Sequence, residues 1–553
     1  MSMADAVFSS FQFTAGDYDP RQEAISTNKQ VDQWFEMDDS GLMELFSSVF
    51  DEENNNDTME KKYESLRNLP PNVSDDFWNE IISEEIEENL EAKQHHHLKQ
   101  KPRSFSLASC DRLMSDYGNI LTMPREGNMN NTGERKLSMD EILRLAGERF
   151  IQFSTNRVDG ISMFIHPYGS FLSGLSMDDT RDVELLRLLL VAGEYVGTQH
   201  FDLANKLISR CLWMASGSGS PVQRVVFYFS EALQEKINRE SGRRININEK
   251  KRKPEKGLAL GTNNTFLATH QGLPFSQVMQ FAGIQSIIEN VKTAQKIHLI
   301  DLQIRSGIQW TALMQGLAEC KIQHLKITAV GTVDQRYMEE TGTRLLNFAN
   351  SLNLPFSFKV VYVTDMREFE ESLLDIEADD TVAVYSYTML RSMISKSDVL
   401  ESVMRSITRL KPALMVVIEV EANHNSPSFV DRFIEALLFY SAFFDCLEDC
   451  MERNSEYRRI LEETYFGEGI VNIVAADGQE RITRNIKLDV WRAFFKRFGM
   501  IEIELSESSK YQASLVVKQF AQGSSCTLEC NGKGLTVGWK GTPLHSLTAW
   551  KFS

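Results

Sequence analysis

The sequence predicts an α/β protein in which a doubly wound, Rossmann-like sheet core follows an α-helical cap and a disordered acidic N-terminal region. Three features predict this order. Residues 1–135 are acidic and poor in apolar clusters, 136–240 carry four helical patterns, and strand-length apolar runs alternate with amphipathic helices from 258 onward. We therefore expect one large ordered domain, 136–553, in which a basic loop at 241–257 joins the cap to the core.

The N-terminal region holds most of the negative charge of the chain. Residues 1–135 contain 27 Asp and Glu against 12 Lys and Arg, a net charge of −15 out of −18 for the whole chain. Little apolar burial is available there to offset chain entropy, so disorder is expected. The nearly neutral remainder lacks the strong basic excess of an autonomous DNA-binding protein.

Two islands in this region, 41–53 and 75–82, place apolar side chains at helical spacing among carboxylates. Such segments can fold against an apolar groove of a partner, as a transactivation segment would. The alternative is a solvated tail with transient helix. The candidate transactivation residues are Leu42, Leu45, Phe46, Phe50, Phe77, Trp78 and Ile81.

The cap is predicted from helix signals. Ser138 and Glu141 match a capping box, a second helix spans about 183–198, a third follows from Phe201, and Pro221 opens a fourth. The second helix is apolar nearly all round, which indicates burial on several sides. Its candidate partner-binding residues, which burial explains equally well, are Leu185, Leu186, Leu189 and Leu190.

The core is predicted from apolar strands that alternate with helices, the pattern of a parallel sheet covered on both faces. The predicted strands are 297–302, 325–330, 356–363, 381–387 and 414–420, and the predicted helices include 310–319, 341–352 and 399–410. A further strand at 470–475 is expected before a polar loop of structural ion pairs around Asp477 and Glu480. The stretches 501–505, 513–520 and 535–552 predict antiparallel strands at a sheet edge.

The turn after the first predicted strand is where such folds bind nucleotides or S-adenosylmethionine. This turn has one glycine, Gly307, whereas cofactor-cradling loops need several, and Gln303 and Arg305 occupy the space of a cofactor. Asp301 is expected to cap the following turn, with a retained ligand-binding carboxylate as the alternative, and His298 is expected to be a satisfied buried histidine. The sheet resembles a methyltransferase scaffold without its site, so no catalytic residue and no cofactor are expected.

The cysteines and the apolar runs argue against a secreted, a membrane-spanning or a zinc-binding protein. The seven cysteines form no disulfide framework, which fits a reducing compartment, and no run approaches the ~20 apolar residues of a membrane span. No secretory signal is visible, so a soluble intracellular protein is expected. Two C-x3-C pairs, Cys446/Cys450 and Cys526/Cys530, invite a zinc site, but ordinary packing on one helix face is the favoured interpretation, and no metal is expected.

A basic cluster lies between the cap and the core. Its tight run of cations predicts a two-part nuclear import signal, with nucleic-acid contact and a solvated loop as alternatives. The candidate import residues are Arg243, Arg244, Lys250, Lys251, Arg252 and Lys253.

The order of segments resembles the plant GRAS family of transcriptional regulators from about Ser138 to Ser553. The leucine-rich block 185–237, the block 345–354 and the segment 432–445 resemble its two leucine-rich regions and part of its PFYRE region. The VHIID-like stretch is Ile297, His298, Leu299, Ile300 and Asp301, and the SAW-like tryptophans are Trp491, Trp539 and Trp550.

The resemblance implies a methyltransferase-like core with a helical cap, action in the nucleus, and control of transcription through complexes with other GRAS proteins and with DNA-binding factors. DNA is expected to be reached through partners, and no membrane is involved. The acidic region lacks the DELLA and TVHYNP motifs, so the chain resembles a DELLA-like branch without the DELLA motif. Direct sequence-specific DNA binding is the first alternative, and binding of S-adenosylmethionine or another small ligand by the core is the second.

Overall fold

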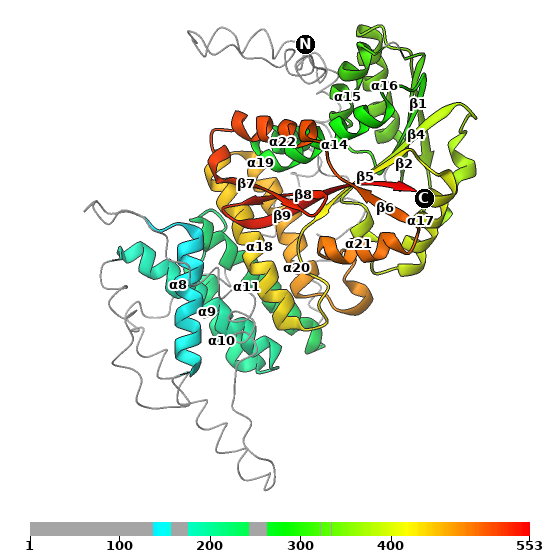
Figure 1. The fold of residues 1–553 in the computed structure, drawn as a ribbon. Coiled ribbons are helices and arrows are strands. Elements are labelled where there is room, and N and C mark those ends of the chain that lie inside the picture. The colour runs from blue at the N-terminus through cyan, green and yellow to red at the C-terminus, as the bar shows by residue number, and fades with distance from the viewer. Residues whose placement is uncertain (1–135, 156–174, 243–262, 321, 333–334, 553) are drawn as a thin grey trace, which may run out of the picture. The chain divides into compact units, whose positions relative to one another are not determined.

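The computed structural model describes residues 136–155, 175–242, 263–320, 322–332 and 335–552. These residues belong to one compact unit, and they consist of a helical layer beside a mixed sheet with helices on both faces (Figure 1). None of the described helices is long and apolar enough to cross a membrane.

The first helices form the predicted cap. Their bounds are α8 (Met139–Thr155), α9 (Met177–Gly197), α10 (Phe201–Met214) and α11 (Pro221–Glu240). The Ser220 hydroxyl accepts from the Gln223 backbone N–H, and the Gln223 side chain accepts from the Ser220 N–H, which closes a capping box at the start of α11. Helix α9 packs against the three others, which explains why its apolar residues surround the whole helix.

Later helices extend this layer. They are α13 (Asn263–Gly272), α18 (Phe429–Cys450), α19 (Glu456–Ile460) and α20 (Glu468–Val474), with a π-helical turn from Leu461 to Gly467 before α20. Helix α11 packs against α18 and α20, and α8 and α9 also touch α18 (Figure 1). The N-terminal cap helices are therefore joined to the core through α18, a helix more than 180 residues further along the chain.

The predicted parallel strands are all present. They are β1 (Lys296–Leu302), β2 (His324–Gly331), β3 (Phe356–Tyr362), β4 (Asp380–Tyr387) and β5 (Leu414–Val420). They lie in the order β3-β2-β1-β4-β5. Strands β2 and β3 are added on one side of β1 and strands β4 and β5 on the other, so the sheet is doubly wound with its switch point at β1. In the register, Asp301 lies between Ala329 and Tyr385.

Helices cover both faces of this sheet. The covering helices are α14 (Pro274–Val291), α15 (Gln309–Ala318), α16 (Gln335–Ser351), α17 (Ser397–Leu410), α21 (Leu488–Lys496) and α22 (Glu507–Gln519). Helix α14 packs on α15, α22, β5 and β9, whereas a second apolar cluster joins α17 and α21 to the opposite face of β1, β4 and β5. Burial on both faces explains the continuous apolar strands.

The C-terminal strands are antiparallel, as predicted. They are β6 (Met500–Ile503), β7 (Cys526–Asn531), β8 (Gly534–Trp539) and β9 (Thr542–Phe552). Strand β9 pairs with β5 on one side and with β8 and then β6 on the other, so the sheet continues as β5-β9-β8-β7.

Two predicted strands were wrong. Residues 513–520 lie mostly in helix α22, whose first turn is capped by Ser506 and whose buried Ser509, Ala513 and Val516 recur at helical spacing against α14. Residues 470–475 lie mostly in helix α20, where Ile470, Ile473 and Val474 form the buried face. In both places a short apolar run fits either period, and the helical spacing decides which face is buried.

Candidate functional site

The VHIID-like residues form most of β1 and are buried. Four of the five side chains are at most 1% exposed and Asp301 is 2% exposed. His298 Nε2 lies 2.8 Å from Thr328 Oγ1, and His298 Nδ1 lies 3.4 Å from Asp380 Oδ2. Burial lowers the pKa of His298 to about 4, so the ring is neutral at pH 7. These contacts give His298 a packing role inside the sheet.

Asp301 ends the strand where a methyltransferase sheet meets its cofactor. Its Oδ2 accepts a hydrogen bond of 2.7 Å from Trp310 Nε1, and the Trp310 ring packs edge-on against Tyr385 at 4.8 Å. Complete burial raises the pKa of Asp301 to about 7, against the hydrogen bond from Trp310 and the charge of Arg305. The expected turn cap is therefore replaced by a tie to the first turn of α15.

The turn that follows β1 is filled by the chain itself. Gln303 has a φ of 70° and donates its backbone N–H to the Val330 carbonyl oxygen at 2.6 Å. Arg305 donates from Nη2 to Thr388 Oγ1 at 2.8 Å, and its guanidinium lies 5.2 Å from the centre of the Tyr387 ring. The side chain of Arg305 therefore spans the ends of two neighbouring strands.

The described residues of this turn do not fit S-adenosylmethionine. Gly307 also has a φ of 70°, yet a Cβ built on it would lie 2.8 Å from Thr341 Cγ2, so the missing side chain makes room for α16 rather than for a ligand. The Asp301 carboxylate is engaged by Trp310. The geometry is that of a packed core at the position where related sheets keep a ligand site.

A buried polar network continues along the same edge. Arg391 donates from Nη1 to Asn485 Oδ1 at 3.1 Å, and the Asn485 amide nitrogen lies 2.8 Å from His424 Nδ1. Glu419 Oε1 accepts from the Leu390 backbone N–H at 2.9 Å. Burial raises the pKa of Glu419 to about 7 and lowers that of His424 to about 4. The network ties the ends of β4 and β5 to the segment before α21.

The four candidate partner-binding leucines are core residues of the protein itself. Leu185, Leu186 and Leu189 are 0% exposed and Leu190 is 3% exposed, all on α9 between α8, α10 and α11. They therefore offer no surface to a partner in this conformation. A direct contact of these leucines with another protein stays a prediction, and their observed role is to hold the cap together.

A network of four charged residues, none of them among the predicted site residues, joins the cap to α18. Arg224 of α11, 1% exposed, donates from Nη2 to Glu448 Oε2 at 3.0 Å and lies 3.5 Å from Glu462 Oε1. Arg458 donates to the same Glu448 oxygen at 2.6 Å and to Glu462 Oε1 at 3.0 Å. An arginine inside the apolar face of the fourth cap helix was the only sequence signal for it.

The polar loop after α20 makes a second link to the cap. Asp477 accepts from Arg432 Nη2 at 2.7 Å and from Lys236 Nζ at 2.6 Å, and Arg239 donates to Glu480 at 3.1 Å. These are structural ion pairs, as the sequence predicted. They join α11, α18 and the loop, so three separate chain segments are fixed at one place.

The SAW-like tryptophans are buried at 2% exposure or less, in two different places. Trp539 Nε1 donates to Asp445 Oδ2 at 2.7 Å, which ties β8 to α18. Trp550 of β9 and Trp491 of α21 both pack against Phe495, at 4.9 Å and 5.5 Å between ring centres. The tryptophans therefore anchor the C-terminal strands to α18 at one place and to α21 at the other.

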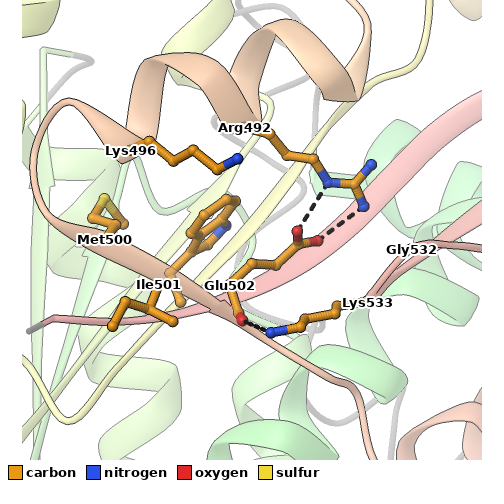
Figure 2. A pocket seen from close by; sticks show the side chains of 8 residues that line it. Arg492, Lys496, Met500, Ile501, Glu502, Gly532 and Lys533 are labelled. Atoms are coloured by element: carbon orange, nitrogen blue, oxygen red, sulfur yellow. Dashed lines mark hydrogen bonds and ion pairs between the residues drawn. The ribbon is translucent and has the colours of Figure 1, made fainter.

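A surface pocket of about 450 Å³ opens between α21, β6 and the β7–β8 turn (Figure 2). Arg492 and Lys496 come from α21, and Trp550 of β9 also lines the pocket. Arg492 forms a bidentate pair with Glu502, at 2.9 Å and 3.0 Å, and Lys533 Nζ donates to the Glu502 carbonyl oxygen at 2.8 Å. The polar groups of Arg492, Glu502 and Lys533 that line the pocket are therefore paired with one another within the chain.

Among the described residues, one acidic grouping has the spacing of a cation site: Glu377, Asp379 and Asp380. Lys296 Nζ already lies 2.7 Å from Glu377 and 3.1 Å from Asp379, so the grouping neutralises a lysine of the chain. The candidate import residues in 243–253 and the candidate transactivation residues in 42–81 lie outside the described residues.

The fold and the edge residues together define a methyltransferase-like α/β scaffold with a helical cap, in which the chain's own side chains fill the usual ligand position. Residues 185–551 match the GRAS domain family. Because this match covers more than half of the chain, the protein belongs to the GRAS domain family.

Its relatives are plant transcriptional regulators. DELLA protein GAI1 of Vitis vinifera is 28% identical over 378 residues, which span 67% of this chain and 62% of the relative. DELLA protein RGL3 of Arabidopsis thaliana is 31% identical over 375 residues, 67% of this chain and 70% of the relative. The crystal structure of SCL7 in Oryza sativa superposes with a TM-score of 0.59 at 28% identity, covering 66% of this chain and 99% of that one. The chain thus spans less than two thirds of the length of the grapevine relative.

Proposed function

We propose that this protein is a nuclear transcriptional regulator that acts through complexes with other GRAS proteins and with DNA-binding factors. The observation that carries the proposal is the match of residues 185–551 to the GRAS domain family, whose DELLA members regulate transcription. The nearly neutral charge of residues 136–553 supports contact with DNA through partners rather than directly.

The outward face of α10 is the partner-binding surface in this proposal. Trp213 is 52% exposed on α10, and the guanidinium of Arg210 lies 4.7 Å from the centre of its ring. Tryptophan and arginine dominate the binding energy of protein interfaces, and a half-exposed tryptophan in a monomer is uncommon. The buried leucines of α9 would then position this face by packing beneath it, and the occupant is a second GRAS protein.

The core serves as a scaffold rather than as an enzyme in this proposal. Two contacts support it, because both engage residues at the strand ends where such folds bind a cofactor: the indole of Trp310 donates to Asp301, and Arg305 donates to Thr388. Titration calorimetry of the full chain with S-adenosylmethionine tests this point. We expect no saturable heat at millimolar cofactor, whereas micromolar binding that Asp301→Asn abolishes would contradict the proposal.

Nuclear action depends on the basic cluster in the proposal. Alanine at Arg243, Arg244 and 250–253 is expected to abolish nuclear enrichment of the tagged protein in plant cells, while normal distribution would reject the import signal. The acidic islands are the proposed activating segments. Deletion of 40–85 is expected to weaken reporter output of a nuclear-targeted protein, and unchanged output would reject that assignment.

A further inference from the structure

Three cysteines from two distant segments gather at the C-terminal end of α18. Cys446 and Cys450 lie one helical turn apart, and the Cys446 thiol donates to Cys450 Sγ at 3.8 Å. Cys526, the first residue of β7, is close enough to both sulfurs to interact with them electrostatically. Cys446 and Cys526 are buried, whereas Cys450 is partly exposed.

The environments of the two α18 thiols differ. The hydrogen bond from Cys446 lowers the pKa of the Cys450 thiol, against burial and the carboxylates of Asp449 and Asp445, and the ammonium of Lys540 acts in the lowering direction. Burial raises the pKa of the Cys446 thiol well above its usual value. A partly exposed thiol whose pKa is lowered, within 3.8 Å of a second thiol, is the arrangement of an oxidation-sensitive site, because the first sulfur reacts and the second resolves the product.

We propose that Cys450 and Cys446 form an oxidation site at which hydrogen peroxide produces an intrahelical disulfide. The Cys450 thiolate attacks one peroxide oxygen, the O–O bond breaks, and the departing hydroxide takes a proton to leave as water. Cys450 is then a sulfenic acid. The Cys446 sulfur attacks it, the S–O bond breaks, and the Cys446 proton leaves with the hydroxyl as a second water. Two thiols are oxidised by two electrons and one peroxide is reduced to two waters.

The disulfide changes the end of α18. A disulfide needs its Cβ atoms about 3.8 Å apart, whereas residues four apart on a helix hold them about 5–6 Å apart. The last turn must therefore unwind, and that turn carries Glu448, the shared partner of Arg224 and Arg458. Oxidation at this site loosens the charged network between the cap and the core.

Peptide mapping of the full-length protein tests the site. The protein is treated with hydrogen peroxide, alkylated and digested with trypsin, which leaves both α18 cysteines in one peptide, 433–453. The expected product is this peptide without alkylation and lighter by two hydrogens, restored by dithiothreitol. Full alkylation of the peptide, or its covalent link to the peptide 519–533 that holds Cys526, overturns the proposal.

Three variants sharpen the result. Cys450→Ser is expected to abolish the oxidised peptide, and Cys446→Ser to leave a Cys450 sulfenic acid that dimedone traps. Cys530→Ser is the matched control, since Cys530 is exposed on β7 and outside the pair, and it leaves the yield unchanged. Retention of the oxidised peptide in Cys450→Ser contradicts the proposal. If a variant fails to fold, the mass of the peptide 433–453 from the oxidised wild-type protein is sufficient to test the proposal.

Discussion

Replacement of Asp301 by asparagine separates the charge of this carboxyl group from its hydrogen bond. The asparagine Oδ1 can accept from Trp310 Nε1 as the aspartate does, and the two side chains have nearly the same volume. The variant therefore keeps the packing of Trp310 on Tyr385 and removes only the proton equilibrium.

The magnitude follows from the pKa in the two states. Burial raises the pKa of Asp301 to about 7 in the folded protein, and the unfolded value is about 3.9. The folded state holds the proton more tightly, so the stabilisation is complete below pH 3.9 and is lost as the pH rises through 7. Linkage for these two values gives a loss of about 2 kcal/mol between pH 5 and pH 7.

Denaturant unfolding of the wild type and of Asp301→Asn at pH 5 and pH 7 measures this loss. All other titrating groups cancel in the difference between the two proteins, so the variant should gain about 2 kcal/mol relative to the wild type over this range. A difference that is the same at both pH values would refute the assignment of Asp301 as a buried, proton-binding carboxyl group.

Three further substitutions test the packing by denaturant unfolding. Leu189→Ala should lower the free energy of unfolding by about 3 kcal/mol, because the side chain is fully buried, and a loss under about 1 kcal/mol would contradict its core role. Gly193→Ala should lower the free energy of unfolding by about 1 kcal/mol, because the new Cβ would lie 2.4 Å from the Phe433 ring and the higher helix propensity of alanine offsets only about half of the resulting strain. A stabilised variant would show that the Phe433 ring can move away without cost. Arg224→Ala should lower the free energy of unfolding by about 4 kcal/mol, because Glu448 and Glu462 would lose this buried cation. An unchanged free energy of unfolding would show that the charged network does not stabilise the link between the cap and α18.

The parallel sheet could be predicted from the sequence because each strand is buried on both faces and reads as a continuous apolar run. The same signal failed at 513–520 and 470–475, where a short apolar run lies in a helix with one buried face and its helical period is hidden by neighbouring apolar residues. The stretch 535–552 was predicted as antiparallel strands and contains most of β8 and β9, but strand β7 alternates weakly and was not predicted.

The candidate site was less predictable because its contacts join distant segments. Glu448 lies 224 residues after Arg224, and Asp445 lies 94 residues before Trp539. No spacing rule relates such pairs. The leucines of α9 were assigned to partner binding although they are buried, because the same leucine-rich sequence can form either an exposed apolar surface or a helix buried on all sides. Only the packing of α8, α10 and α11 around α9 distinguishes them.

In the proposed function the protein regulates transcription through partners that contact its cap. The most direct measurement is quantitative mass spectrometry of proteins that co-purify from plant nuclei with the tagged wild type, Trp213→Ala and the control Tyr511→Ala. Tyr511 is 53% exposed on α22, as Trp213 is 52% exposed on α10, so neither variant should unfold. We predict that GRAS proteins and DNA-binding factors are recovered with the wild type and the control, and that the GRAS proteins are lost with Trp213→Ala. Recovery of no transcription factor with the wild type, from a protein that remains largely outside the nucleus, would contradict the proposed function.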